Sequence, residues 1–280
     1  MKELMLGNEA VARGIYEAGV KVVSSYPGTP STEITEFVAK TNEVYSEWAP
    51  NEKVAFEVAF GASIGGARAF CAMKHVGLNV AADPLYTSSY IGVNGGMVCA
   101  VADDPGMHSS QNEQDSRHHA IASKVPMLEP SNSSECKEFT KLAFELSEQF
   151  DTPVLLRLST RVSHSRSPVE ICERIELPLK EYKKNAAKNV MMPAMAKAKH
   201  PVVEERTQKL REYAENSSIN KIERFSDEIG VIVAGTTYNY AREALGNNAS
   251  YLKLGMVNPL PIKLICDFAK TVKRVIVIEE

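Results

Sequence analysis

Hydroxyl side chains and a glycine gather in SSYPGTPSTEI (24–34), where an apolar run passes into a turn and a helix start. We predict that Pro30 takes the first position of that helix, a place where proline is favoured. This order puts backbone N–H groups and the Thr29 hydroxyl at the carboxyl end of a strand, where open α/β sheets usually bind ligands. Two interpretations stay open: a ligand-binding turn, or hydroxyls that only cap a helix.

A glutamate stands inside an apolar helix pattern in NEKVAFEVAFGASIGGARAF (51–70). Helical spacing places Glu57, Gly61 and Arg68 on one face. An unpaired carboxylate in apolar surroundings is costly, and an unforced glycine in a helix costs about 1 kcal/mol. Both features predict a buried carboxylate beside a groove that another group approaches closely. The alternative is a structural ion pair of Glu57 with Arg68 or Lys74.

The elements that position these residues follow a repeating pattern through residues 1–160. Short apolar runs rich in β-branched residues alternate with segments of helical period, which is typical of an α/β fold with a parallel sheet flanked by helices. The predicted strands span 20–25, 44–48, 70–73, 97–102 and 153–158. Among the helices between them, we expect Asn8 to cap the first and Asn51 to cap the third.

The pattern changes beyond residue 160. Residues 161–226 are dense in charged side chains and predict a connector with one charged helix over 203–214. A second α/β pattern follows over 227–280. Its predicted strands span 229–234, 251–254 and 272–278, and its predicted helices span 239–245 and 262–270.

The composition is that of a globular protein. The chain has 280 residues and a net charge of −3, so it has no broad attraction for nucleic acid. Neither a signal peptide nor an apolar stretch of ~20 residues is present, and we expect a cytoplasmic protein without a membrane span. The five cysteines are scattered without a C-x-x-C pair, which predicts buried reduced thiols and no metal site.

Four motifs occur in a specific order: YPGTPSTEI, NEKVAFEVAFGASIGGARA, MKHVGLNVAADPL (73–85) and ADDPGMHSSQNEQDSRHHA (102–120). By this order, residues 1–158 resemble the N-terminal part of the large (alpha) subunit of indolepyruvate ferredoxin oxidoreductases. These belong to the thiamine-diphosphate-dependent 2-oxoacid:ferredoxin oxidoreductase superfamily. GMVNPLP (255–261) and the final VIVIEE resemble, more weakly, the transketolase C-terminal-like domain that follows in the same family.

The resemblance implies roles for several residues. Glu57 matches the catalytic glutamate that contacts the aminopyrimidine ring of thiamine diphosphate and tunes its proton transfers. Cofactor-binding positions match Pro27, Gly28 and Thr29 of the turn and Gly61 of the helix. The Thr29 hydroxyl also matches a substrate-binding group.

Two further residues match the substrate side of the site. The resemblance makes Arg117 a candidate for a two-pronged contact with the substrate carboxylate. His108 lies in the same loop and is a second candidate. The alternative for Arg117 is a solvated loop arginine without a binding role.

The resemblance also implies an architecture. Residues 1–160 would form the pyrimidine-binding domain, 161–226 the connector, and 227–280 the truncated start of the transketolase C-terminal-like domain. No Gly-Asp-Gly and no ferredoxin-like cysteine run occurs. We therefore expect Mg²⁺ and the diphosphate to be held by a domain absent from these residues, and 4Fe-4S clusters only in the full-length subunit.

The complete enzyme implied by the resemblance oxidatively decarboxylates arylpyruvates such as indolepyruvate to aryl-acetyl-CoA. Its partners would be the 2-oxoacid, coenzyme A, ferredoxin, a small (beta) subunit and a second copy in a homodimer, whereas the 280 residues alone would be inactive. One alternative is the same chemistry on pyruvate, 2-oxoglutarate or branched 2-oxoacids. Another is a non-catalytic assembly module. A dinucleotide-binding dehydrogenase is disfavoured, because no G-x-G-x-x-G follows a predicted strand.

Overall fold

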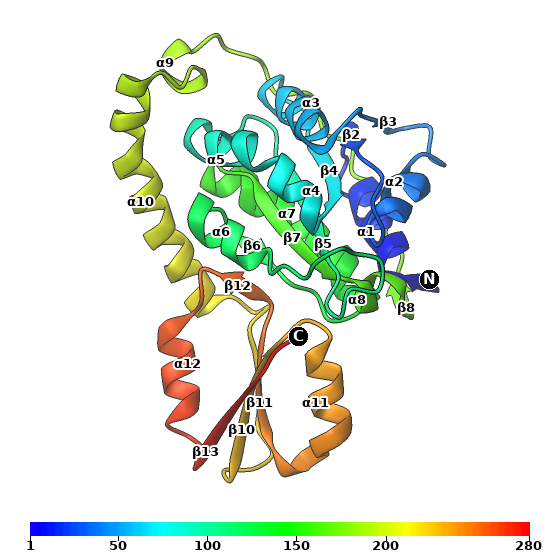
Figure 1. The fold of residues 1–280 in the computed structure, drawn as a ribbon, viewed down its shortest axis with the longest axis vertical. Coiled ribbons are helices and arrows are strands. Elements are labelled where there is room, and N and C mark those ends of the chain that lie inside the picture. The colour runs from blue at the N-terminus through cyan, green and yellow to red at the C-terminus, as the bar shows by residue number, and fades with distance from the viewer.

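The computed structural model describes all 280 residues and contains a large and a small sheet, each flanked by helices (Figure 1). The large sheet has seven strands in the order β12-β6-β7-β5-β4-β2-β3. Its strands are β2 (Val22–Ser25), β3 (Tyr45–Trp48), β4 (Ala69–Lys74), β5 (Met97–Asp103), β6 (Met127–Leu128), β7 (Val154–Ser159) and β12 (Met256–Asn258). All pairings are parallel except that of β12 with β6.

Helices cover both faces of the large sheet, as the apolar runs of its strands require. They are α1 (Gly7–Glu17), α2 (Thr32–Val38), α3 (Glu52–Ile64), α4 (His75–Val80), α5 (Ala82–Ile91), α6 (Arg117–Ser123), α7 (Ser133–Phe150) and α8 (Thr160–His164). One core cluster joins the sheet to α1, α2 and α7, and the other joins it to α3, α4, α5 and α6. The predicted class, a mostly parallel sheet flanked by helices, is confirmed.

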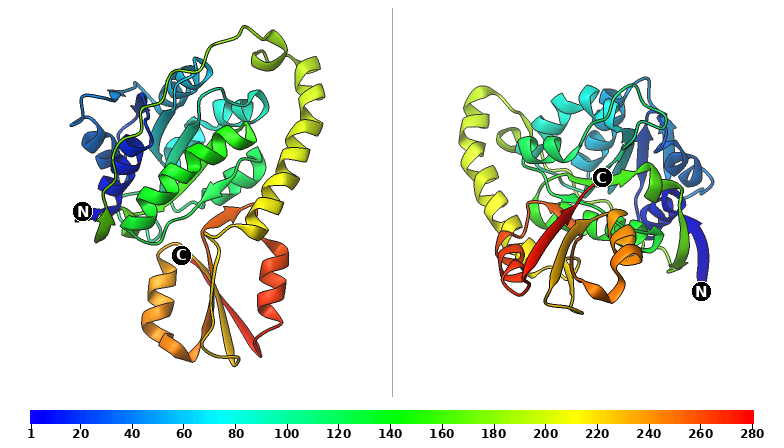
Figure 2. Two further views of the ribbon diagram at one scale, coloured as in Figure 1. Left: turned by 180° about the vertical axis from the view of Figure 1, so that it is seen from behind. Right: turned by 60° about the horizontal axis from the view of Figure 1, so that its bottom comes forward.

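The connector is more structured than the sequence predicted. Strand β8 (Arg166–Glu170) pairs antiparallel with β1 (Lys2–Leu6). The chain then crosses the outside of the large unit to α9 (Ala186–Asn189) and α10 (Pro193–Asn216), as Figure 2 shows. The predicted charged helix lies inside α10, which begins ten residues earlier because Ala, Met and Lys of the loose tract favour helix.

A second, smaller unit follows α10; we term residues 221–280 the small unit. Its sheet has the order β13-β10-β11-β9, all parallel except β9. Its elements are β9 (Lys221–Glu223), β10 (Ile229–Ala234), α11 (Thr237–Leu245), the 3-10 turn η1 (Gly246–Asn248), β11 (Ser250–Leu254), α12 (Ile262–Ala269) and β13 (Arg274–Ile278). The segment after β11 leaves this unit and adds β12 to the large sheet, so the two units are interlocked.

Three local expectations have different outcomes. The Asn51 side chain accepts a hydrogen bond from the Val54 N–H and caps α3, as predicted. Asn8 does not cap α1. It is buried inside the first turn and its amide donates to the Pro30 carbonyl at 2.7 Å, so it joins α1 to the turn before α2. Pro30 also lies before α2, whose N-cap is Ser31.

None of the helices is both long enough and apolar enough to cross a membrane. The five cysteines are free thiols, and the expectation that all are buried is wrong. Cys172 and Cys266 are exposed, because they lie on the connector and on the outer face of α12.

Candidate functional site

The turn after β2 is held together by its own hydroxyls. The Gly28 N–H donates to the Thr32 hydroxyl at 2.9 Å, and the Ser31 hydroxyl donates to the Gly28 carbonyl at 2.9 Å. Thr29, by contrast, is exposed and its hydroxyl has no hydrogen-bond partner within the chain. Two of the hydroxyls therefore build the turn, while that of Thr29 is free to meet a ligand.

A glycine lets this turn lie against the end of β4. A Cβ atom on Gly28 would stand 3.1 Å from the Cβ of Lys74, the last residue of β4. The Lys74 ammonium group donates to the Ser109 carbonyl in the loop that carries His108. The turn, the end of β4 and this loop thus meet at the carboxyl edge of the large sheet. His108 itself is exposed.

A buried aspartate fixes the shape of that loop. Asp104 follows β5 and accepts hydrogen bonds from the Ser109 N–H at 2.7 Å and from the Ser110 and Thr160 hydroxyls at 2.6 Å each. Burial alone would raise the pKa of Asp104. These hydrogen bonds outweigh burial and lower the pKa to about 2. Asp104 is therefore ionised at neutral pH and holds the loop as an acceptor.

Helix α3 presents the predicted carboxylate, but on its outer side. The buried residues of α3 are Ala55, Phe56, Ala59 and Ser63. Glu57 and Gly61, four positions apart, lie on the opposite face and are exposed. The shared face is confirmed for Glu57 and Gly61 but not for Arg68, which lies beyond the end of the helix, and the predicted burial of Glu57 within this chain is wrong. The helix is apolar on nearly every side, so the sequence could not indicate which side packs on the sheet.

The structural ion pair considered for Glu57 does not form. Arg68 lies beyond the end of α3 and makes two hydrogen bonds to Glu148 of α7, at 3.1 and 3.0 Å. Lys74 is engaged with Ser109. A Cβ atom on Gly61 would meet nothing within 4 Å. The outer face of α3 therefore combines a carboxylate without a partner and a glycine that no group of this chain requires.

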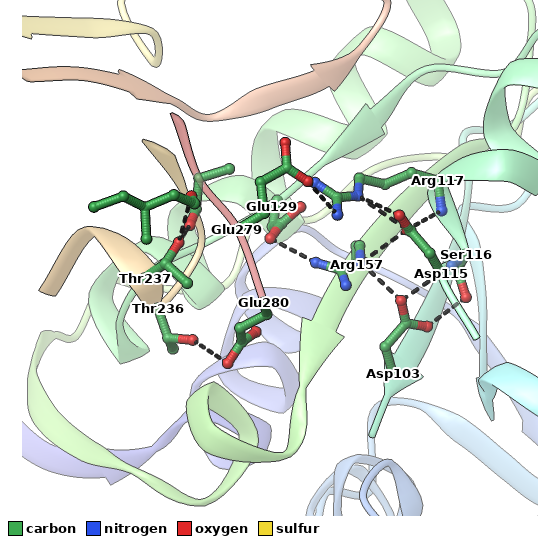
Figure 3. Close-up of polar contacts among 12 residues, drawn as sticks. Asp103, Asp115, Ser116, Arg117, Glu129, Arg157, Thr236, Thr237, Glu279 and Glu280 are labelled. Carbon is green, nitrogen blue, oxygen red and sulfur yellow. Dashed lines mark hydrogen bonds and ion pairs between the residues drawn. The ribbon is translucent and has the colours of Figure 1, made fainter. Parts of the chain in front are cut away.

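A buried ion network lies where the large and small units meet, and Figure 3 shows its members. Arg157 of β7 is 3% exposed; its Nε lies 2.7 Å from an Asp103 oxygen and its Nη1 lies 2.6 Å from a Glu129 oxygen. Asp103 also accepts a hydrogen bond from the Ser116 N–H at 3.0 Å. Burial alone would lower the pKa of Arg157. The Glu129 and Asp103 carboxylates outweigh burial and raise the pKa, so the guanidinium stays charged.

Glu129 and Asp115 respond to these charges in opposite ways. Burial raises the pKa of Glu129 despite Arg157 and Arg117, and its second oxygen is buried without a partner. Burial likewise raises the pKa of Asp115, but hydrogen bonds from Arg117 outweigh it, so the pKa is lowered. Asp115 is thus held as an anion beside Arg117.

Arg117 is not a solvated loop arginine. It begins α6, its side chain is 16% exposed, and its Nε donates to both Asp115 oxygens at 2.9 and 3.0 Å. Its Nη2 lies 2.8 Å from an oxygen of Glu279, which follows β13 of the small unit. No hydrogen bond or ion pair within the chain joins Glu57 to Arg117 or to Thr29. Thr29, His108 and Arg117 thus belong to segments that follow strands of the large sheet at its carboxyl edge, and Glu57 is exposed on the outer face of α3.

Apart from Arg117, the charged residues between the units were not predicted from the sequence. One signal was available: Arg157 interrupts the apolar strand PVLLRLS, where an arginine needs buried partners. A second tether carried no such signal. Lys253 of β11 contacts Glu135 of α7 at 2.5 Å and the Ser131 hydroxyl at 2.7 Å. No group of three or more His, Cys, Asp or Glu side chains could hold a metal ion.

Comparison with known proteins identifies the family. The family model described as "Pyruvate flavodoxin/ferredoxin oxidoreductase, thiamine diP-bdg" matches residues 13–230, which include the turn, α3 and the Arg117 loop. The chain belongs to this family. Its matched segment is therefore a thiamine-diphosphate-binding domain of the oxidoreductase superfamily, as the four motifs indicated.

Curated relatives agree with this assignment. "Indolepyruvate oxidoreductase subunit IorA" of Archaeoglobus fulgidus is 45% identical over 100% of the chain, and that of Methanothermobacter marburgensis is 46% identical over 99%. The chain covers 47% and 46% of these two proteins, so it spans about half their length. A "2-oxoglutarate synthase subunit KorA" of Methanocaldococcus jannaschii is 30% identical over 62% of the chain.

Solved structures share the fold. The chain resembles "2-oxoglutarate:ferredoxin oxidoreductase from Magnetococcus marinus with 2-oxoglutarate, coenzyme A and succinyl-CoA bound" with a TM-score of 0.82 at 19% identity, over 99% of the chain and 57% of that protein. It also resembles "Split gene transketolase, inactive beta4 tetramer" with a TM-score of 0.58 at 15% identity, over 98% of the chain and 78% of that protein.

Proposed function

We propose that this family member supplies the aminopyrimidine-binding part of an enzyme that oxidatively decarboxylates arylpyruvates such as indolepyruvate to aryl-acetyl-CoA and reduces ferredoxin. The observation that carries the proposal is the outer face of α3, where the exposed Glu57 carboxylate stands one turn from Gly61. The identity to indolepyruvate oxidoreductase subunits favours arylpyruvates over pyruvate, 2-oxoglutarate or branched 2-oxoacids.

The residues present fit the cofactor. Glu57 has no ion-pair or hydrogen-bond partner within the chain, and the space outside Gly61 is open to 4 Å. A flat ring with a hydrogen-bonding nitrogen needs both a free carboxylate and close access to backbone. When bound, thiamine diphosphate supplies the nucleophilic carbon that attacks a 2-oxoacid. Glu57 would hold the aminopyrimidine and share a proton with its ring nitrogen.

The other roles follow from position at the sheet edge. Thr29, with Pro27 and Gly28, would line the cofactor and offer its free hydroxyl to the substrate. Arg117 would bind the substrate carboxylate, and His108 would lie on the exposed loop above the site. We further propose the division at residues 160 and 226 into a pyrimidine-binding domain, a connector and the start of a transketolase C-terminal-like domain.

The remaining parts of the enzyme would come from outside these residues. We propose that another part of the protein holds Mg²⁺ and the diphosphate, that the full-length subunit carries the 4Fe-4S clusters, and that a small subunit and a second copy complete a cytoplasmic assembly. The relatives are subunits by name, which supports a complex. The outer face of α3 is the surface that a partner domain or second copy would cover.

The carboxylate can be tested in the complete enzyme with Glu57→Gln. Because loss of a positioned proton-transfer group costs about 10²- to 10⁴-fold in rate, we expect kcat on indolepyruvate to fall at least about 100-fold while folding is normal. The control is Glu212→Gln, which removes an exposed carboxylate on α10. A kcat close to that of the unsubstituted enzyme would refute the catalytic role and favour the assembly module.

The 280 residues alone provide a second test. A cofactor held only at its pyrimidine end loses the metal-bridged phosphate contacts, so we expect weak binding and no turnover. Titration calorimetry with thiamine diphosphate and Mg²⁺ measures this directly. Binding at a micromolar Kd would contradict the proposed division of the cofactor site.

A further inference from the structure

Two carboxylates from different elements contact the guanidinium group of Arg117. Asp115, two residues away on the same loop, accepts from Nε with both oxygens. Glu279, which comes from the small unit, lies 2.8 Å from Nη2. A contact at Nε alone leaves the plane of a guanidinium free to turn, whereas a second contact from a separate element fixes that plane. No hydrogen bond within the chain uses Nη1, which leaves this nitrogen as a donor for a ligand.

Glu279 stands at a favourable place in the small sheet. In the order β13-β10-β11-β9, the central strand β10 has β11 on one side and β13 on the other, with α11 and α12 on opposite faces (Figure 1). The carboxyl ends of β10 and β13 lie side by side, and this edge of an open α/β sheet is the usual ligand position. Glu279 follows β13 directly at this edge.

A cavity lies at this edge, between the two units. It has a volume of about 210 Å³, and most of its lining is apolar, with Val257, Leu260 and Val277 among the apolar side chains. The polar side chains of the lining are Asp115, Arg117, His118 and Glu279. An arginine among apolar side chains suits an organic anion with an apolar body. Arg117 is the only Arg or Lys of this lining, so it is the side chain that would meet the anion.

We propose that Glu279 is a positioning residue for Arg117, through which the small unit takes part in binding the carboxylate of an apolar 2-oxoacid. This inference rests on the proposed role of Arg117 in substrate binding. Asp115 in turn is steadied by Arg157, whose Nε lies 3.8 Å from an Asp115 oxygen. Arg117 is thus fixed by one carboxylate from each unit. A shift of the small unit relative to the large sheet would therefore turn the Arg117 guanidinium group.

Glu279 can also act against substrate binding. Its carboxylate could compete with the substrate for Arg117, and removing it would then tighten substrate binding. The side chain of Glu279 is 56% exposed, so solvent screens its charge and weakens such competition. We expect the positioning of Arg117 by Glu279 to dominate. Loss of positioning would raise KM, whereas loss of competition would lower it.

The test is Glu279→Gln in the full-length enzyme with its partner subunits and thiamine diphosphate, assayed with indolepyruvate. We expect KM to rise about fivefold with kcat within about twofold, since the lost interaction acts on substrate binding. Glu279→Asp should restore most of the KM. The matched control is Glu280→Gln, which removes the neighbouring carboxylate, bound at 2.9 Å to Thr236 rather than to Arg117.

A double substitution separates the possible failures. In an Arg117→Lys background, Glu279→Gln should change KM by less than about twofold, because coupled residues are not additive. No turnover of the unsubstituted enzyme on any 2-oxoacid would defeat the proposed function itself. Normal KM in Arg117→Lys would defeat the role of Arg117. A raised KM in Arg117→Lys with an unchanged or lower KM in Glu279→Gln would overturn this inference alone.

Discussion

Gly61→Ala should stabilise the 280-residue chain and impair the complete enzyme. Gly61 lies inside α3, and an added Cβ would meet nothing within 4 Å, so the substitution loses no contact. Alanine is favoured over glycine in a helix interior, and at an unstrained position the exchange raises the free energy of unfolding by about 0.4–1 kcal/mol. For a chain of this size, that is a rise in Tm of roughly 1–3 °C. Denaturant unfolding followed by circular dichroism measures it.

The complete enzyme should respond in the other direction. If the aminopyrimidine ring and a partner surface pack against α3, the new methyl group enters a close contact. Overpacking of this kind costs about 1–3 kcal/mol. At 1.4 kcal/mol for each factor of ten, thiamine diphosphate should bind roughly 5- to 150-fold more weakly. The assay is the cofactor concentration that gives half-maximal turnover.

Gly14→Ala is the matched control for the same exchange. A Cβ atom on Gly14 of α1 would stand 2.7 Å from the Lys137 carbonyl oxygen, so this variant should lower the stability of the chain by about 1–3 kcal/mol. Gly61→Ala with reduced chain stability would show that the face of α3 is not open. Gly61→Ala with an unchanged cofactor requirement would show that nothing approaches this face in the enzyme.

Three further predictions concern buried charges. Asp104→Asn should lower the free energy of unfolding at pH 7 by about 2 kcal/mol. Because the pKa of Asp104 is lowered to about 2, the difference between the two proteins should shrink as pH falls from about 4 towards 2, as measured by urea titrations. Arg157→Met leaves Asp103 and Glu129 without their cation and should lower the free energy of unfolding by about 3–5 kcal/mol at pH 8. The loss should be smaller at pH 5, because the raised pKa of Glu129 lets the folded state take up a proton. Lys253→Met should cost about 3 kcal/mol in the same measurement, and adding Glu135→Gln should recover most of the loss.

The principal strands could be predicted because their signals are local. Strands such as β5 and β7 read as continuous apolar runs between turns, and the cap of α3 depends on one asparagine and its own backbone. The strands that were missed pair over long sequence distances. β12 and β6 have three and two residues and join segments more than a hundred positions apart, so no pattern within either one reports the pairing.

The candidate site divides in the same way. Helical spacing correctly put Glu57 and Gly61 on one face, because spacing is a property of the helix alone. Which face packs on the sheet depends on the surroundings, and a helix apolar on most sides does not encode that choice. Arg117 was found through the motif that contains it, whereas its contact with Glu279 depends on how the two units meet.

The interlocking of the two units bears on how the site is built. A buried ion pair contributes little net stability but can select one geometry over others, because any shift leaves a charge unpaired. Glu129 makes the junction specific in this sense: it binds Arg157 with one oxygen, and its N–H donates to the Gly255 carbonyl at 2.9 Å. Gly235 follows β10 with φ +54°, and a Cβ there would stand 2.4 Å from the same Glu129 oxygen. The close approach of the units therefore requires glycine at the end of β10, and the carboxylate that this glycine admits is the one that holds Arg157. The small unit therefore contributes, through Glu279, to the position of Arg117 at the edge of the large sheet.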